Sequence, residues 1–145
     1  MKLFTIGFTQ RSAENFFSAL SSARVKRVAD VRLNNVSQLA GFAKREDLRW
    51  FLKTICGADY LHLPELAPSQ EILEAYKKNK GLWAVYEKDF LQLMAERKAE
   101  QTLSGILSDR DCLLCSEKEP EKCHRRLVAE YLKEKWGNVE IVHLL

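Results

Sequence analysis

The sequence predicts an α/β fold: a single domain with a mostly parallel, Rossmann-like sheet of about five strands and helices on both faces. Short β-prone runs alternate with helical patterns along the chain, and this alternation implies crossover connections between parallel strands. Right-handed crossovers would bring the carboxyl ends of the strands to one edge of the sheet. The 145 residues are enough for one continuous core, and we expect one domain over residues 1–145.

The chain begins with a strand, a helix and a second strand. Residues 3–6 form a compact β-prone run that Gly7 ends. Ser12 is a suitable N-cap for the helix that follows. Residues 25–31 then return to β character. The predicted inward face of the helix is Phe16, Phe17 and Leu20.

The middle of the chain predicts three helices and a short third strand. A helix begins near Arg45, and Pro64 closes the strand at residues 59–63. Helices at residues 69–78 and 82–100 follow. The predicted inward residues are Leu48, Phe51, Leu52 and Ile55 in the first of these helices, and Val85, Phe90, Leu91 and Met94 in the last.

The end of the chain predicts a strand, a helix and a closing strand. Residues 112–115 form an apolar fourth strand, and a helix at residues 121–135 follows a short polar loop. Pro120 can open this helix at its first position. Residues 139–143 are the closing strand. The buried stripe of the helix is predicted to be Leu127, Val128, Tyr131 and Leu132.

Composition narrows the class of protein. A hydrophobic share of 46% and a charged share of 30% are typical of a soluble globular protein. The net charge of +3 is mild, and the basic residues are interspersed with acidic ones, so charge alone does not argue for nucleic acid. No apolar stretch is long enough to span a membrane, and the N-terminus turns polar too soon for a signal peptide. The four cysteines are therefore interpreted as reduced thiols of a cytoplasmic protein without a membrane partner.

Polar side chains follow four of the predicted strands. Ligands of open α/β sheets bind in the crevice beyond the carboxyl ends of the strands. We therefore expect these residues to gather around one ligand if their strands are neighbours. They are Thr9, Gln10 and Arg11 after the first strand, Asp30, Arg32, Asn34 and Asn35 after the second, His62 and Glu65 after the third, and Cys115, Ser116 and Glu117 after the fourth.

Cys115 is the best candidate nucleophile. His124 lies one turn before Val128, so it should point inward at the crevice, flanked by Arg125, whereas Cys123 falls away from the buried stripe. A helix N-terminus and nearby cations lower the pKa of a thiol and favour the reactive thiolate. The nearby glutamates oppose this effect, and the alternative is that Cys115 is a small buried hydrophobe that ends a strand.

Zinc is a second possibility for the same segment. Cys112 and Cys115, followed by Cys123 and His124, offer four soft ligands. However, an odd offset sends Cys112 and Cys115 to opposite faces of a strand. Adjacent residues of a helix, such as Cys123 and His124, also point about 100° apart. We therefore predict no metal. The single Gly7 after the first strand makes no G-x-G-x-x-G motif, so we predict no dinucleotide or other cofactor.

Asp30 and Arg32 each have two possible roles. Asp30 could be a general base or bind a hydroxyl group, while Arg32 grips a phosphate or carboxylate. Alternatively, the two form a structural pair that fixes loops. His62 could carry a proton or simply bond a loop carbonyl. Helical spacing of Trp50, Trp83 and Trp136 favours the core or its rim over a platform for base stacking.

Four segments carry a resemblance to a known family. They are Thr5-Ile6-Gly7-Phe8-Thr9, Asp30-Val31-Arg32, Tyr60-Leu61-His62-Leu63-Pro64-Glu65-Leu66, and Leu113-Leu114-Cys115-Ser116-Glu117 with Cys123-His124-Arg125-Arg126. On these segments the chain resembles, from end to end, the domain-of-unknown-function family catalogued under number 488. The resemblance implies a compact α/β domain and a shared polar pocket, but no activity.

The chain also departs from that family. Many members look to carry a histidine where Phe8 stands, so a mechanism that needs a histidine there is not expected. The loop at residues 33–42 resembles that of one branch of the family, and we expect it to shape the ligand.

These observations predict an enzyme of hydrolysis or group transfer that acts on a small anionic substrate, such as a nucleotide or a component of nucleic acid. The predicted catalytic residues are Asp30, Cys115 and His124, and the predicted substrate-binding residues are Thr9, Arg32, Asn34, His62, Glu65, Glu117 and Arg125. The main alternative is a non-catalytic module that binds a nucleotide or nucleic acid. A third possibility is a metal-dependent protein.

Overall fold

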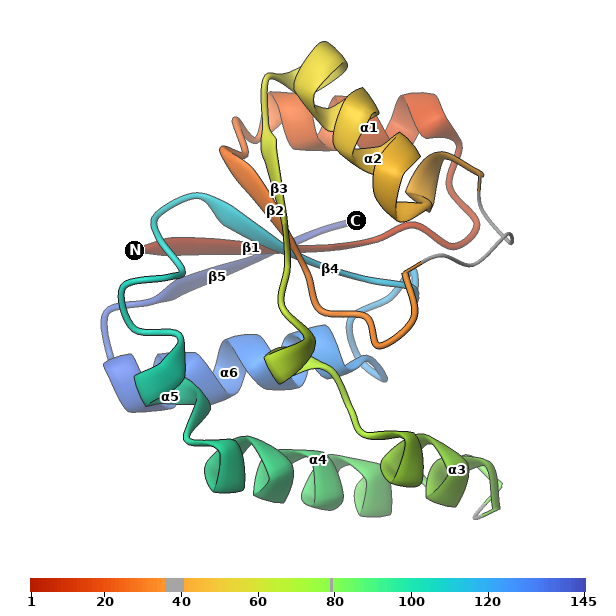
Figure 1. Cartoon of the computed structure of the whole chain (residues 1–145), viewed down its shortest axis with the longest axis vertical. Coiled ribbons are helices and arrows are strands. Elements are labelled where there is room, and N and C mark those ends of the chain that lie inside the picture. Colours follow the sequence, from red (N-terminus) through yellow and green to blue (C-terminus); the bar gives the residue numbers. More distant parts are fainter. Residues whose placement is uncertain (36–40, 79) are drawn as a thin grey trace.

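In the computed structural model, which describes residues 1–35, 41–78 and 80–145, a five-stranded sheet lies between two layers of helices (Figure 1). All four strand pairings are parallel, and the strand order is β3-β2-β4-β1-β5. The predicted α/β fold with a Rossmann-like sheet is confirmed. The strands are β1 (Lys2–Gly7), β2 (Arg27–Asp30), β3 (Asp59–His62), β4 (Asp111–Cys115) and β5 (Glu140–Leu144).

The strand register brings the predicted site residues to one edge of the sheet. Gly7 pairs with Cys115 across β1 and β4, and Asp30 pairs with His62 across β2 and β3. Asp30 also pairs with Leu114, one residue before Cys115. Because all the strands run in the same direction, their carboxyl ends meet at this edge, as the sequence predicts.

Helices cover both faces of the sheet. On one face lie α1 (Ala13–Ser22) and α2 (Arg45–Phe51), which continues into a π-helical turn at Leu52–Cys56 (Figure 1). On the other lie α3 (Gln70–Lys78), α4 (Trp83–Arg97), α5 (Ala99–Thr102) and α6 (His124–Trp136) (Figure 1). Short 3-10 turns occur at Gly41–Ala43 and Pro64–Leu66. No described helix has the length and apolar character needed to cross a bilayer.

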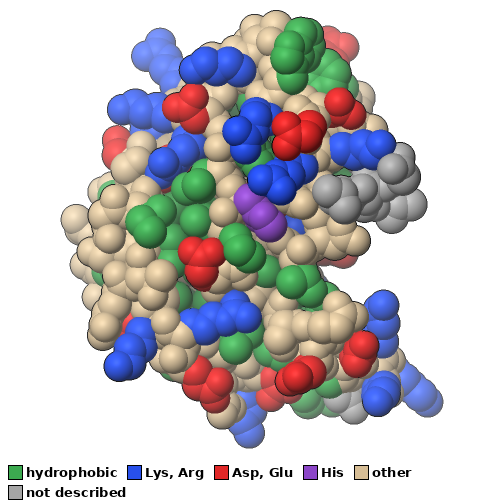
Figure 2. All heavy atoms as spheres, in the orientation of Figure 1, with side chains coloured by type: hydrophobic (Ala, Val, Ile, Leu, Met, Phe, Trp, Pro, Cys, Tyr) green, Lys and Arg blue, Asp and Glu red, His purple; other side chains and the backbone are tan. Residues whose placement is uncertain are grey.

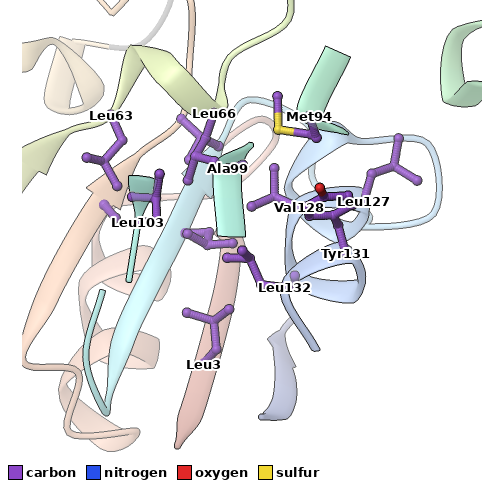
Figure 3. Close-up of a cluster of buried hydrophobic side chains, with 14 of the residues drawn as sticks. Leu3, Leu63, Leu66, Met94, Ala99, Leu103, Leu127, Val128, Tyr131 and Leu132 are labelled. Carbon is purple, nitrogen blue, oxygen red and sulfur yellow. The ribbon is translucent and has the colours of Figure 1, made fainter. Parts of the chain in front are cut away.

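Two hydrophobic clusters sit on opposite faces of the sheet. Successive side chains of a strand point to opposite faces. Leu113 and Cys115 therefore enter the cluster beneath α4 and α6, while Cys112 and Leu114 enter the cluster beneath α1. Figure 3 shows side chains of β1 and α6 pointing toward one another in the first cluster. The prediction that Cys112 and Cys115 occupy opposite faces is confirmed.

Two helices differ in their winding from the predicted regular helix. The helix predicted over residues 82–100 breaks at Lys98, which adopts the left-handed conformation (φ 52°, ψ 50°) and separates α4 from α5. Ile55 was predicted to point inward, but 53% of its surface is exposed. The π-helical turn that begins at Leu52 explains this difference, because wider winding rotates the following side chains away from the α-helical stripe.

The last helix begins three residues later than predicted, at His124. Its N-cap is Cys123, whose backbone is extended (φ −140°, ψ 138°). The amide of Cys123 donates to the carbonyl of Pro120 at 3.2 Å, so Pro120 belongs to a turn before the helix. The prediction that Pro120 opens the helix is therefore wrong. Ser12, by contrast, caps α1 as predicted, since its hydroxyl accepts from the Asn15 amide.

Candidate functional site

A cavity of about 460 Å³ lies beyond the carboxyl ends of β2 and β4. Its size suits a small organic ligand. Figure 2 shows the surface notched on the side of α3, between the two helical layers. The loop after β2 contributes Arg32, Leu33 and Asn34. The end of β4, the loop after it and the start of α6 contribute Cys115, Ser116, Glu117, Lys122, Cys123 and His124. The remaining wall is Pro68, Gln70, Leu73, Tyr76, Lys77, Trp83 and Tyr86.

Cys115 and His124 are in direct contact at the cavity wall. The Cys115 sulfur lies 3.3 Å from Nδ1 of His124, and Nε2 of His124 lies 2.7 Å from the carbonyl oxygen of Val31. Because a carbonyl only accepts, Nε2 must carry the proton and donate it. Nδ1 of the neutral ring is then left with a lone pair that faces the thiol. This arrangement can take a proton from Cys115 and orient the resulting thiolate.

The environment of Cys115 favours its thiolate. Burial opposes ionisation, but hydrogen bonds from the Cys123 thiol and the Ser116 amide, together with the charge of Arg125, hold the pKa of Cys115 below its usual value. Asp30 acts weakly in the opposite direction. Burial, followed by the neighbouring Cys115, raises the pKa of Cys123 well above its usual value. Of the two thiols, Cys115 is therefore the one suited to nucleophilic attack.

Cys123 lies in the site, which corrects the prediction that it falls away from the buried stripe. That prediction placed Cys123 inside a regular helix, whereas its extended backbone turns the side chain inward. It is buried and lines the cavity. The metal-ligating atoms of Cys115, Cys123 and His124 all lie within 4.8 Å of one another. These three residues are the group within the described chain that could hold a soft metal ion.

Asp30 and Arg32 form a buried, two-pronged ion pair. Nε and Nη2 of Arg32 donate to the two carboxylate oxygens of Asp30 at 2.9 and 2.8 Å, and the Arg32 amide donates to Oδ1 at 3.1 Å. The Tyr60 hydroxyl donates to Oδ2 of Asp30 at 2.6 Å. Nη2 of Arg32 also donates to the carbonyl of Ala43. Asp30 thus positions the guanidinium of Arg32, which lines the cavity.

The pKa values of Arg32 and Tyr60, the two side chains that donate to the Asp30 carboxylate, are both shifted. Burial disfavours the charged form of Arg32, but the hydrogen bonds and charge of Asp30 outweigh it and raise the pKa of Arg32. Burial, and then the nearby charge of Asp30, raise the pKa of Tyr60. Arg32 therefore remains a cation and Tyr60 a neutral donor.

Arg125 is fully buried and shapes the loop after β4. Its guanidinium donates to the carbonyls of Glu117 and Lys118. Gly7 lies directly beneath this contact, since a Cβ atom there would come within 1.6 Å of the Glu117 carbonyl oxygen. Arg125 thus acts on the cavity through the loop and through its charge beside Cys115, and it is not one of the lining residues.

The structure does not bring Thr9, His62 or Glu65 into the cavity wall. Thr9 is exposed, and its amide donates to the Ser116 carbonyl at 3.0 Å. Nε2 of His62 lies 2.9 Å from the carbonyl oxygen of Arg32. This contact agrees with the alternative interpretation, in which His62 bonds a loop carbonyl. Glu65 presents its carbonyl to Arg97. The site residues that the structure does gather at the wall are Arg32, Asn34, Cys115, Glu117 and His124.

The sequence reasoning missed an aromatic wall. The rings of Trp83 and Tyr86 stack with centroids 4.8 Å apart, and Tyr76 lies 5.0 Å from Tyr86. All three line the cavity, with Lys77 beside them. Three aromatic residues among residues 76–86 were a visible signal, but helical spacing alone does not separate a core residue from one at a cavity rim.

Half of the loop that was expected to shape the ligand, residues 36–40, lies outside the described residues. Residues 33–35 and 41–42 of the loop are described, with Leu33 and Asn34 at the cavity.

A family model described as "Domain of unknown function DUF488" matches residues 12–132 of the chain. A comparison with curated proteins and one with solved structures give no significant match.

Proposed function

We propose that this chain, which belongs to the DUF488 family, is an enzyme of hydrolysis or group transfer that acts on a small anionic substrate through Cys115. The observation that carries the proposal is the contact of 3.3 Å between the Cys115 sulfur and Nδ1 of His124, at the wall of a cavity. A thiol beside an oriented imidazole is the arrangement of an activated nucleophile.

The proposed reaction has two steps. In the first, the Cys115 thiol gives its proton to Nδ1 of His124, and the thiolate forms a bond to the electrophilic atom of the substrate. The bond to the leaving group breaks, and the leaving group takes the proton from His124. In the second, water or another acceptor gives a proton to Nδ1 of His124 and bonds to the same atom, the bond between that atom and the Cys115 sulfur breaks, and Cys115 takes the proton from His124. Val31 holds the His124 ring in place throughout.

The remaining cavity residues suit an anionic substrate with a flat ring. Arg32 is a buried, permanently charged donor at the cavity, and guanidinium groups bind phosphate and carboxylate well. Lys77 and Lys122 add positive charge, and Tyr76, Trp83 and Tyr86 supply ring faces. A nucleotide or a nucleic-acid component has both features. Asp30 has the role of a positioning residue, because Arg32 and Tyr60 already occupy its carboxylate.

The test is a panel of mononucleotides, measured by thermal shift and then by mass spectrometry for products. A nucleotide present at about 100 times its Kd stabilises the fold by about 2.7 kcal/mol. We expect Arg32→Ala to remove this shift, and Cys115→Ser to lower product formation on the order of 10³-fold or more while the nucleotide still binds. Cys56→Ser is the matched control, because Cys56 lies outside the cavity.

The same experiment distinguishes the enzyme from a non-catalytic module that binds nucleotides. The aromatic wall and Arg32 would suit such a module as well. Binding without turnover would establish that module and end the enzymatic proposal. Turnover that persists in Cys115→Ser would exclude Cys115 as the nucleophile. A cytoplasmic location stays a prediction of the sequence.

A further inference from the structure

The donor atoms of Cys115, Cys123 and His124 have the spacing of a metal site. All lie within 4.8 Å of one another, and the Cys115 sulfur lies 3.3 Å from Nδ1 of His124. Zinc binds sulfur at about 2.3 Å and imidazole nitrogen at about 2.0–2.1 Å, so a tetrahedral ion places these two atoms about 3.5 Å apart. The existing contact therefore needs little change to admit an ion.

The orientation of the His124 ring also suits a metal ligand. Its Nε2–H donates to the carbonyl of Val31 at 2.7 Å, which leaves the lone pair of Nδ1 facing the Cys115 sulfur, with the Cys123 sulfur nearby. A histidine that binds a metal usually donates its other ring proton to a carbonyl or carboxylate, which fixes the tautomer and the direction of the ring. Val31 supplies that partner here.

The charges at the site also suit a cation. Cys115 and Cys123 are both buried and lie side by side, so two thiolates there would require a compensating charge. Arg125 lies close enough to act on Cys115, but its guanidinium is engaged by loop carbonyls. A divalent ion between the two sulfurs would provide that charge directly.

We propose that Cys115, Cys123 and His124 bind Zn²⁺, with the fourth coordination position open to the cavity. All three ligands line the cavity, so a water molecule or an anionic ligand can reach that position. Cys112 takes no part, because its side chain lies on the opposite face of the sheet. Three protein ligands and one open position are typical of zinc sites that exchange ligands, whereas purely structural sites use four protein ligands.

Zinc binding does not rest on the proposed reaction, and the two exclude each other in one molecule. The metal would occupy the sulfur of Cys115 and Nδ1 of His124, which are the atoms that the nucleophilic route requires. Zinc is therefore expected to inhibit that route.

The test uses the full chain, reduced and stripped of metal, and titrated with Zn²⁺ and with Co²⁺. We expect one ion per chain, a rise in melting temperature, and thiolate-to-cobalt charge-transfer absorption. Cys115→Ser, Cys123→Ser and His124→Ala should each weaken binding by more than about tenfold. Cys56→Ser makes the same chemical change outside the cluster and should leave binding unchanged. Binding that Cys123→Ser does not weaken would overturn the proposal.

A second measurement needs no variant. Zinc should slow the alkylation of Cys115 and Cys123 in the natural sequence but leave that of Cys56 unchanged, as read by mass spectrometry of peptides. Equal protection of all thiols, or none, would also overturn the site. Turnover by metal-free protein together with no zinc binding would remove only the metal proposal. Zinc binding without any turnover that depends on Cys115 would remove only the enzymatic one.

Discussion

Asp30 holds the guanidinium of Arg32, a cation of the cavity wall, in position. It is completely buried and accepts hydrogen bonds from the Arg32 amide, the Arg32 guanidinium and the Tyr60 hydroxyl. Asn35 in turn donates to the Tyr60 oxygen at 3.1 Å. With its lone pairs used in this way, Asp30 has little capacity left to take a proton from a substrate. The geometry favours the structural reading of the Asp30–Arg32 pair.

Asp30→Ala should lower the free energy of unfolding by about 3–5 kcal/mol, because it leaves the Arg32 guanidinium buried without its counter-charge. Tyr60→Phe removes the hydrogen bond to the Asp30 carboxylate and the one that Tyr60 accepts from Asn35, and it should cost about 1.5–3 kcal/mol. Urea unfolding of the two variants measures both values. If Asp30→Ala costs no more than Tyr60→Phe, the charge of Arg32 is compensated by other groups.

At the scale of elements, the end of β1 and the loop after β4 approach each other closely beside the site. Gly7 ends β1, and the backbone oxygen of Glu117 occupies the space where a side chain would stand. The Thr9 amide bonds the carbonyl of Ser116 in the same loop. The loop that carries the candidate nucleophile is thus held against the end of a central strand.

Gly7→Ala should destabilise the fold by about 3 kcal/mol or more, because neither backbone can move without breaking the sheet or the loop. Gly41→Ala is the matched control, since among the described residues no atom beyond its chain neighbours lies within 4 Å of its added carbon. Thermal unfolding compares the two. A Gly7→Ala protein as stable as Gly41→Ala would contradict the close approach.

The edge strand β5 carries a titrating group, His143, whose Nδ1 lies 2.6 Å from the Thr5 hydroxyl. Burial, and then the charge of Arg125, lower the pKa of His143 from its ordinary 6.5, with a smaller opposing effect of Glu130 and a further lowering by Arg126. The unfolded chain therefore takes up this proton at a higher pH than the folded chain.

Stability should consequently fall as the pH drops below about 6.5, until the folded protein also becomes protonated. We expect His143→Asn to lose less stability than the natural sequence between about pH 7.5 and pH 5.5. Melting temperatures at the two pH values measure the difference. A drop of the same size in both proteins would show that other groups are responsible.

At the scale of the whole molecule, one sheet joins two hydrophobic clusters. Phe16 fills the cluster beneath α1, and Phe90 fills the cluster beneath α4 and α6, and both are fully buried. The strands β1 and β4 contribute alternate side chains to both clusters. Neither cluster can lose its packing without disturbing the strands that support the other.

Phe16→Ala and Phe90→Ala should each cost about 3–5 kcal/mol, and each variant should still unfold in one transition. Calorimetry tests this by comparing the calorimetric enthalpy with the van't Hoff enthalpy. Two separate transitions in either variant would mean that the helical layers unfold independently.

The fold could be predicted from local patterns to a large extent. All five strands lie where the β-prone runs predict them, and Ser12 caps α1 as expected. The differences arise where the backbone leaves regular geometry. The π-helical turn at Leu52–Cys56 exposes Ile55, and Lys98 adopts a left-handed conformation inside a continuous helical pattern. Periodicity assumes constant winding, so it cannot anticipate either change.

The site was predictable in part. The inward position of His124 follows from its place one turn before Val128, and the meeting of Asp30 with the end of β4 follows from parallel neighbouring strands. The role of Cys123 was missed because it depends on where α6 begins. The turn at Pro120 delays that start and leaves Cys123 extended.

Local patterns in the sequence are enough to predict the α/β class, the positions of the strands, and the edge of the sheet at which Asp30, Arg32 and Cys115 meet. These features depend on local periodicity and on the common direction of parallel strands. The three-dimensional structure was needed to find that Cys123 joins Cys115 and His124, and that Trp83 and Tyr86 line the cavity. Contacts between residues distant in the chain follow from how a turn aims a helix and how helices pack on the sheet, and no local pattern encodes that.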